Sequence, residues 1–130
     1  MNKLTVFEAL REFEDAFNPE GGNRGFTRDN INLRMSLIEE EVREAFIEMR
    51  INVDLINKAA LTKELSDIMY VVIGTAEVLD FPLEEVFMRT HYSNMSKLGD
   101  DGFPIYREDG KVLKGPNYEP PVLRDLFDES

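Results

Sequence analysis

Apolar residues recur every three or four positions near the start of the chain, the spacing that places side chains on one face of a helix. This periodicity predicts a first amphipathic helix from Leu4 to Phe17. A segment rich in helix breakers, Asn18 to Asn23, follows and ends it. The apolar positions of the predicted helix are Val6, Leu10, Phe13 and Phe17.

A second helical pattern runs from about Arg28 to Arg50, with Thr27 as a candidate N-cap. Its expected core stripe comprises Met35, Ile38, Val42, Ala45, Phe46 and Met49. The neighbouring face begins apolar and becomes acidic, and it comprises Leu33, Leu37, Glu41 and Glu44. Carboxylates that continue an apolar face are less solvated than charges on an outer face, which favours a ligand role for them.

A third helix is predicted from Asn57 to Leu79, and its second half, Ile68 to Leu79, is apolar nearly all round. Such a helix is buried on most sides, either by other helices or by a second subunit. Pro82 is well placed at the first turn of a fourth helix that extends to about Lys97.

The composition of the chain changes after Leu98, where four of the six prolines fall between Pro104 and Pro121 among several glycines. Asp109-Gly110 predicts a turn or short hairpin, followed by an extended tail. The fold class is all-α: a bundle of four to five helices with an irregular C-terminal tail. We expect residues 1–98 to form the helical metal-binding bundle and residues 99–130 the Gly/Pro-rich tail of the same single domain.

Composition narrows the functional classes. The chain has 130 residues and a net charge of −11, which disfavours nucleic-acid polymers and anionic membranes as partners. There is no cysteine, so disulfides, zinc–thiolate sites and a thiol nucleophile are excluded. The charged first twenty residues exclude a signal peptide, and no apolar stretch is long enough to span a bilayer. We therefore expect a cytoplasmic protein.

Five carboxylates carry the candidate chemistry, in an E-E-x-x-E pattern followed by E-x-x-D: Glu40, Glu41, Glu44, Glu64 and Asp67. Residues three or four apart share a helix face, so two helices packed side by side would bring at least four carboxylates together. Like charges that close raise each other's pKa or need a cation between them. Mg²⁺ prefers oxygen ligands, commonly a few carboxylates with water and substrate phosphate. The alternative is a pair of solvated helix faces. Asp67, however, directly precedes the apolar stretch that begins at Ile68, which favours a metal site over a solvated surface.

A single histidine, His91, excludes a ferritin-like di-iron bundle, which needs two Glu-x-x-His motifs. It shares one helix edge with Asn94 and Lys97, which we expect to point at the metal cluster and hold phosphate or sugar. Lys111 and Lys114 form a second basic pair in the glycine-rich tail, where they could close over a triphosphate. The alternative for all of these side chains is an ordinary solvated surface.

The acidic motifs, in an all-helical chain of this size, resemble the MazG-like, all-α nucleoside triphosphate pyrophosphohydrolases. This superfamily includes dimeric dUTPases and phosphoribosyl-ATP pyrophosphohydrolase. Two further segments, 91–98 and 106–118, are similar to a bacterial and phage branch labelled phosphoribosyl-ATP-pyrophosphohydrolase-like or "Cof-like". The resemblance covers roughly Val6 to Pro121. The haloacid-dehalogenase phosphatase that "Cof-like" suggests needs an Asp-x-Asp motif after a strand, which this chain lacks.

The resemblance implies hydrolysis of a nucleoside triphosphate between the α and β phosphates, giving monophosphate and pyrophosphate. The apolarity of Ile68 to Leu79 on nearly all sides separately predicts a homodimer or homotetramer. Mg²⁺, or Mn²⁺, would be ligated by Glu41, Glu44, Glu64 and Asp67. Glu40 would orient or deprotonate the attacking water or help to hold another metal, and a shifted helix phase would exchange its role with that of Glu41. The substrate would be bound by Asn94, Lys97, Lys111 and Lys114. The rival hypothesis is a noncatalytic helical module that senses nucleotides or binds a protein.

Several properties stay open at this point. No motif encodes the preferred base or sugar, the number of metal ions, or the choice between dimer and tetramer. A role in sanitising the nucleotide pool and one in phage nucleotide metabolism are equally compatible with the sequence.

Overall fold

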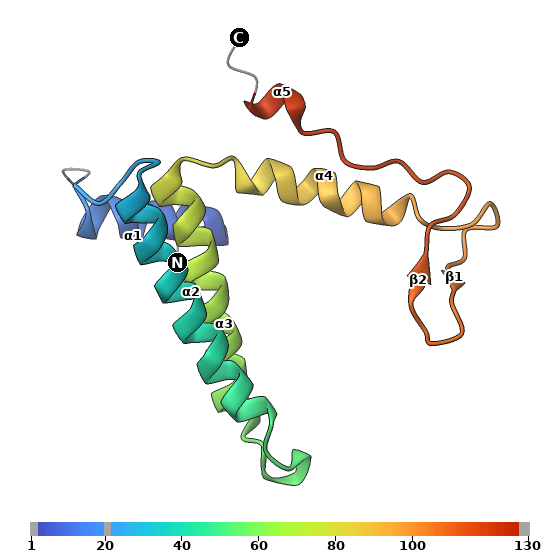
Figure 1. Cartoon of the computed structure of the whole chain (residues 1–130), viewed down its shortest axis with the longest axis horizontal. Helices are drawn as coiled ribbons and strands as arrows, with labels where there is room; N and C mark the ends of the chain where they lie inside the picture. Colours follow the sequence, from blue (N-terminus) through green and yellow to red (C-terminus); the bar gives the residue numbers. More distant parts are fainter. Residues whose placement is uncertain (1–2, 20–21, 128–130) are drawn as a thin grey trace. The chain divides into compact units, whose positions relative to one another are not determined.

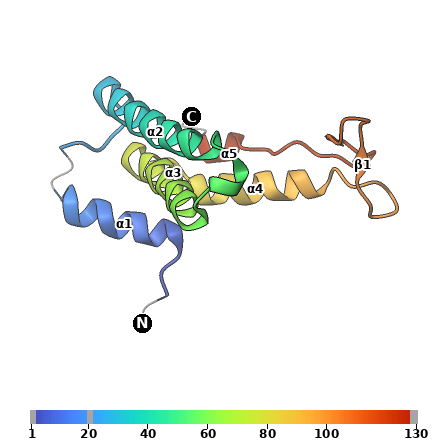
Figure 2. The same ribbon diagram turned by 90° about the horizontal axis from the view of Figure 1, so that it is seen from below.

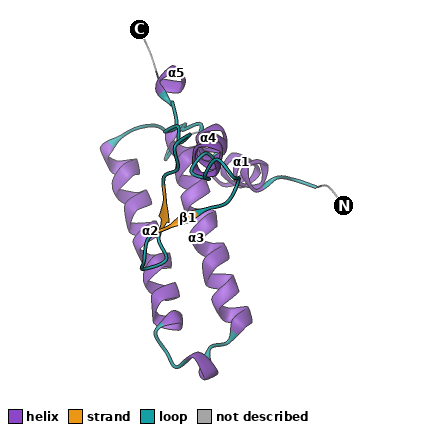
Figure 3. Cartoon of the chain, turned by 90° about the vertical axis from the view of Figure 1, so that its right-hand side faces the viewer, coloured by secondary structure: helices purple, strands orange, loops and turns teal. Residues whose placement is uncertain are grey.

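The computed structural model describes residues 3–19 and 22–127, and its secondary structure is mostly helical (Figures 1 and 3). The chain divides into two compact units, Met1–Phe81 and Pro82–Ser130. The predicted all-α class is confirmed, since the described strands amount to one two-stranded hairpin. In the described residues no helix is long and apolar enough to cross a membrane.

The first unit contains the three long helices that the apolar periodicity predicts. These are α1 (Val6–Phe17), α2 (Arg28–Met49) and α3 (Lys58–Leu79), with the short 3-10 turn η1 (Val53–Leu55) before α3. Helices α2 and α3 lie side by side as an antiparallel hairpin, and α1 packs against α3 (Figures 1 and 2). The side chains of Thr5, Thr27 and Asn57 cap the three N-termini, so the predicted cap at Thr27 is confirmed.

The buried part of the first unit is small and consists mainly of modest side chains. Its apolar members are Leu10, Ala45, Ile73, Ala76, Val78 and Leu79, and none of the larger described side chains is fully buried. The predicted core stripe of α2 is therefore only partly right: Ala45 is buried, but Met35, Phe46 and Met49 are exposed. The reason is geometric, because α3 covers a single side of α2 and the apolar stripe is wider than one neighbouring helix can cover.

The second unit begins with α4 (Leu83–Met95), for which Pro82 is the N-cap residue instead of lying inside the first turn. A hairpin follows, in which β1 (Ile105–Tyr106) pairs antiparallel with β2 (Val112–Leu113). Gly110 occupies its turn with φ of +89°, a conformation that glycine adopts without steric cost. The predicted hairpin is confirmed, whereas the tail, expected to be extended, also contains the short helix α5 (Arg124–Phe127).

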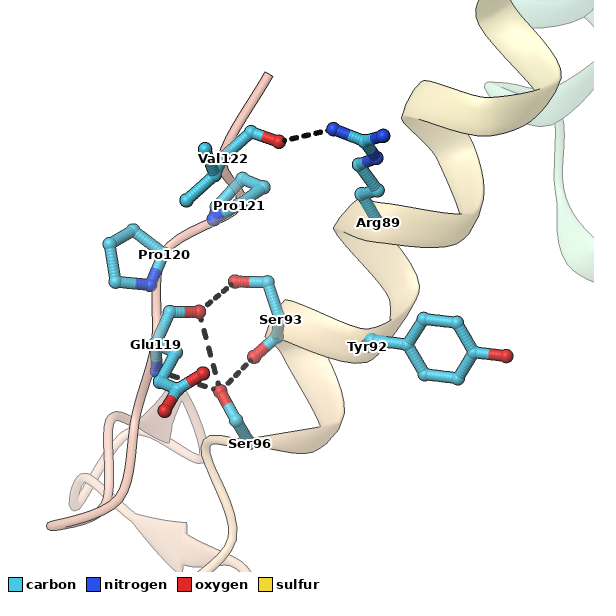
Figure 4. Close-up of a pocket in the computed structure, with 8 residues that line it drawn as sticks. All are labelled: Arg89, Tyr92, Ser93, Ser96, Glu119, Pro120, Pro121 and Val122. Carbon is cyan, nitrogen blue, oxygen red and sulfur yellow. Dashed lines mark hydrogen bonds between the residues drawn. The ribbon is translucent and has the colours of Figure 1, made fainter. Parts of the chain in front are cut away.

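Polar side chains of α4 and of its C-cap residue, Ser96, hold the tail against that helix (Figure 4). Ser93 donates from Oγ to the Glu119 carbonyl oxygen at 2.7 Å, and Ser96 Oγ accepts from the Glu119 N–H at 2.9 Å. Arg89 donates from Nη1 to the carbonyl oxygen of Val122 at 2.9 Å and to Asp125 Oδ1 at 2.6 Å. A hollow of about 350 Å³ lies between the helix and this tail segment.

Candidate metal centre

The α2–α3 hairpin brings acidic side chains from both helices to one place. Glu41 on α2 and Glu64 and Asp67 on α3 each offer a carboxylate oxygen, and these atoms all lie within 4.8 Å of one another. The convergence follows from the sequence spacing, because Glu64 and Asp67 lie one turn apart on the α3 face that meets Glu41 across the antiparallel hairpin. All three residues are half-buried.

Two oxygens of this cluster lack a hydrogen-bond partner in the part of the chain that the structure describes. Glu41 Oε2 and Glu64 Oε2 are buried from solvent, and neither has a hydrogen-bond partner among the described residues. An unsatisfied buried carboxylate oxygen costs free energy, since it loses its bonds to water and gains nothing in return. A bound cation would supply what these atoms lack.

The cluster is electrostatically strained by its own charges. Partial burial raises the pKa of Glu41 above its ordinary value, and repulsion from Glu44 and Asp67 raises it further. The pKa of Glu64 is raised for the same reasons, first by burial and then by Glu44 and Asp67. Both groups are therefore easier to protonate than free carboxylates, and a positive ion among them would reverse that effect.

Lys63 provides a positive charge at the cluster that the sequence reasoning missed. Its ammonium Nζ lies 2.6 Å from Asp67 Oδ1 and 2.7 Å from Oδ2, one helical turn away on α3. Because the Lys63 side chain is 70% exposed, solvent screens this pair and its contribution to stability is small. The i, i+4 spacing from Lys63 to Asp67 is the signal that could have identified it.

The other predicted acids lie at the margin of the cluster. Glu44 is exposed, yet it is close enough to raise the pKa of both Glu41 and Glu64. Glu40 is exposed on α2 beside Glu41 and also raises its pKa, more weakly. Neither is among the three carboxylates that meet within 4.8 Å, so their ligand and catalytic roles stay predictions.

The predicted substrate-binding residues all belong to the second unit and are placed within that unit alone. Asn94 is exposed on α4, and Lys97 follows the end of that helix. The Gly115 N–H donates to the Lys97 carbonyl oxygen at 2.8 Å, which brings the segment after β2 next to Lys97. The exposed Lys114 places its ammonium 4.7 Å from the ring centre of Tyr118, and Lys111 is exposed in the hairpin turn.

The three convergent carboxylates fit a hard divalent cation. Two ligands on opposite sides of Mg²⁺ are about 4.2 Å apart, twice the Mg–O distance of ~2.1 Å. The observed limit of 4.8 Å thus requires only small side-chain adjustments for these oxygens to share one ion. An all-oxygen donor set without histidine or cysteine favours Mg²⁺ or Mn²⁺ over zinc or copper.

Comparison with known proteins finds a matching family and a similar solved structure. The sequence profile of the family described as phosphoribosyl-ATP pyrophosphohydrolase matches residues 10–94, which include all five candidate acids. Among solved structures, the chain is similar to a crystal structure of a protein from Exiguobacterium sp. 255-15 described as a proposed NTP pyrophosphohydrolase. The two are 20% identical with a TM-score of 0.48, over 98% of this chain and 85% of that one. No curated protein matches the chain. Because the family profile spans about two thirds of the sequence, the chain belongs to the phosphoribosyl-ATP pyrophosphohydrolase family.

Proposed function

We propose that this protein is a metal-dependent nucleoside triphosphate pyrophosphohydrolase, which cleaves a (d)NTP between its α and β phosphates. The observation that carries the proposal is a pair of buried oxygens, Glu41 Oε2 and Glu64 Oε2, which have no hydrogen-bond partner among residues 3–19 and 22–127 and lie within a cluster of three carboxylates. Membership of a pyrophosphohydrolase family supports the reaction class.

In this proposal some acidic side chains hold a cation, and another orients the attacking water. Glu41, Glu64 and Asp67 would hold Mg²⁺ or Mn²⁺, with Glu44 as a fourth ligand from the next turn of α2. When bound, the ion would neutralise charge on the phosphates and make a water molecule more acidic. The protein then mainly positions the reacting groups, as in other phosphoryl-transfer sites.

Glu40 is the proposed residue for orienting or deprotonating the attacking water. It is exposed and lies next to Glu41 in sequence, so its carboxylate is free to accept a proton at the edge of the cluster. Glu41 is the alternative base if Glu40 instead helps to hold a second ion. Asn94, Lys97, Lys111 and Lys114 are proposed to bind the phosphates or sugar, because amide and ammonium groups match those acceptors.

The substrate class rests on the residues outside the acidic motif. Segments 91–98 and 106–118 are similar to a branch with a lysine-rich tail, and we propose that this branch acts on a free nucleoside triphosphate in preference to phosphoribosyl-ATP. Association with a second copy of the chain is part of the same proposal, since many apolar side chains of α2 and α3 are exposed.

A nucleotide panel tests the assignment. The purified protein is incubated with each common and modified (d)NTP and with phosphoribosyl-ATP, in Mg²⁺ or Mn²⁺. We expect one or a few (d)NTPs to give monophosphate and pyrophosphate. Exclusive turnover of phosphoribosyl-ATP would overturn the substrate class, and release of orthophosphate would overturn the reaction.

The rival noncatalytic module is separated from the enzyme by calorimetry. The enzyme hypothesis predicts stoichiometric Mn²⁺ binding that Asp67→Ala removes, while the helical content of that variant is unchanged. The rival predicts no site-specific binding of Mg²⁺ or Mn²⁺, with or without nucleotide.

A further inference from the structure

Arg34 is a charged side chain inside the helix hairpin that carries the candidate acids. It lies on α2, two turns before Glu41, and only 12% of its side chain is exposed. Its Nε donates to Thr75 Oγ1 at 3.0 Å and its Nη2 to the Val71 carbonyl oxygen at 3.1 Å, both on α3. Thr75 Oγ1 also donates to that carbonyl at 2.6 Å, so the three groups form a closed polar link between the helices.

The same guanidinium reaches the third helix of the unit. Its Nη1 lies 3.9 Å from Glu14 Oε1 on α1, and the Glu14 side chain is only 7% exposed. Gly74 on α3 makes room for the group, because a Cβ at this position would lie 2.8 Å from Arg34 Nη2. The site is thus shaped around an arginine with three separate contacts.

The polar link of Arg34, Thr75 and Val71 and the acidic cluster lie next to each other along the antiparallel pair of α2 and α3. Arg34 is seven residues before Glu41 on α2, and Val71 is seven after Glu64 and four after Asp67 on α3. Seven residues are close to two turns, so the two layers share one helix face. A slip of one residue would move Glu41 by ~1.5 Å along the axis. That is more than the small adjustment the carboxylates need in order to share an ion.

Apolar packing alone does not fix this register. The buried apolar residues where α2 meets α3 are few, and no large described side chain is fully buried. Hydrophobic contact is non-directional. Two hydrogen bonds from the planar Arg34 guanidinium, in contrast, fix both the position and the angle of α2 relative to α3. In addition, the acids repel one another at the next layer, which favours separation of the helices.

We propose that Arg34 is a positioning residue, which fixes the register of α2 on α3 and thereby brings Glu41 to Glu64 and Asp67. Its consequence for metal binding rests on the proposed function, but its effect on the helix pair does not. The simpler alternative is that Arg34 only neutralises the buried Glu14 and contributes stability without setting the register.

Two variants separate these roles. Arg34→Lys keeps a positive charge beside Glu14. It lacks the planar guanidinium that donates to Thr75 and to Val71 at the same time. Thr75→Val removes the hydroxyl that accepts from Arg34 Nε and leaves the Arg34–Glu14 pair intact. Val78→Ala is the matched control, since it removes buried apolar volume from α3 without removing a polar contact of Arg34.

The readout is a distance measured in the metal-free protein. Because the chain has no cysteine, Ser36→Cys and Ser66→Cys, at exposed positions on α2 and α3, introduce two unique sites for nitroxide labels. Pulsed electron paramagnetic resonance then gives the distribution of distances between the helices. We expect a narrow distribution in the parent protein and in Val78→Ala, and a broadened or shifted one in Arg34→Lys and Thr75→Val.

Mn²⁺ titration of the same proteins adds the second readout. We expect Arg34→Lys and Thr75→Val to bind Mn²⁺ about tenfold more weakly than the parent, the lower end of what loss of an outer support costs a metal site. Unchanged distances in both variants would overturn the proposal, even if their stability fell. If the parent protein binds no Mn²⁺, the proposed function fails, and the distances alone still decide the role of Arg34.

Discussion

Glu64 is unfavourable as a carboxylate in the metal-free protein. Its pKa is raised above the ordinary value of 4.5 by burial and by neighbouring acids, so the folded state holds its proton more tightly than the unfolded state does. Stability falls with rising pH wherever the folded state binds more protons. Glu64 and Glu41 therefore lower the free energy of unfolding as the pH rises above about 4.5.

Glu64→Gln tests this conflict between stability and function. We expect the metal-free variant to unfold at a higher temperature than the parent near neutral pH, with a smaller difference near the ordinary carboxyl pKa. The reason is that the amide removes a repelled charge while keeping the shape of the side chain. The parent should also gain stability when Mn²⁺ is added, because a ligand that binds only the folded state stabilises it, and the variant should gain none.

Glu12→Gln, at an exposed position on α1, is the control and should change neither behaviour. A Glu64→Gln protein that is less stable than the parent at neutral pH, without metal, would show that Glu64 is not strained by its neighbours.

Individual residues show where sequence reasoning succeeds. The E-E-x-x-E and E-x-x-D spacings predicted that at least four carboxylates would converge, and three of them, Glu41, Glu64 and Asp67, lie within 4.8 Å of one another. Arg34 was overlooked, because an arginine among apolar positions on a helix looks like a solvated charge until its partners on another helix are known. Its partners Thr75 and Val71 lie about forty residues away, beyond any local pattern.

At the scale of elements, Gly115 controls how the tail meets the end of α4. Its N–H donates to the Lys97 carbonyl oxygen, and a Cβ at this position would lie 2.7 Å from that oxygen and closer still to the carbonyl oxygen of Leu98. Both neighbours are backbone atoms, so they cannot rotate away as a flexible side chain could. Only glycine fits this crossing.

Gly115→Ala should release this segment from α4. Overpacking of this kind costs about 1–3 kcal/mol. We therefore expect backbone amides of residues 113–119 to exchange with deuterium roughly tenfold faster or more, while α2 and α3 are unaffected. Gly22→Ala is the matched control, because nothing lies within 4 Å of a Cβ there. Unchanged exchange in the 113–119 segment would contradict the described crossing.

The helices themselves were largely predictable, and the tail was not. The start of α2 agrees with the predicted cap at Thr27, and α3 begins one residue after its predicted start at Asn57, since capping and apolar periodicity are local signals. The short α5 and the bonds from Arg89, Ser93 and Ser96 to the tail depend on contacts between distant segments. Such contacts leave no periodic trace in the sequence.

At the scale of the molecule, many apolar side chains of α2 and α3 are exposed, and no described segment of the chain buries them. Exposed members on these helices include Leu33, Met35, Phe46, Ile47, Met49, Leu65, Met69, Tyr70 and Val72. Exposed apolar side chains that form one continuous patch mark an interface, and these residues are the candidates for such a patch. The sequence predicted either other helices or a second subunit for Ile68 to Leu79, and the described helices leave part of that stretch uncovered.

We expect light scattering at micromolar concentration to give the mass of a dimer or tetramer. The net charge of −11 on each copy opposes association, so added salt should strengthen it by screening that repulsion. Met69→Glu should shift the mass towards the monomer, because it puts a charge into the apolar surface, whereas Ser66→Glu serves as the control. A clean monomer for the parent protein at every salt concentration would contradict this expectation.

The central claim is that the acids between α2 and α3 hold a metal ion that drives hydrolysis at the α–β bond. The most direct test follows a turned-over (d)NTP by phosphorus NMR, with the parent protein and Glu41→Gln, in Mg²⁺ and after chelation. We predict equal amounts of nucleoside monophosphate and pyrophosphate from the parent with Mg²⁺, and no turnover after chelation or in the folded Glu41→Gln variant. Nucleoside diphosphate with orthophosphate, or equal turnover without metal or without the Glu41 carboxylate, would contradict the account.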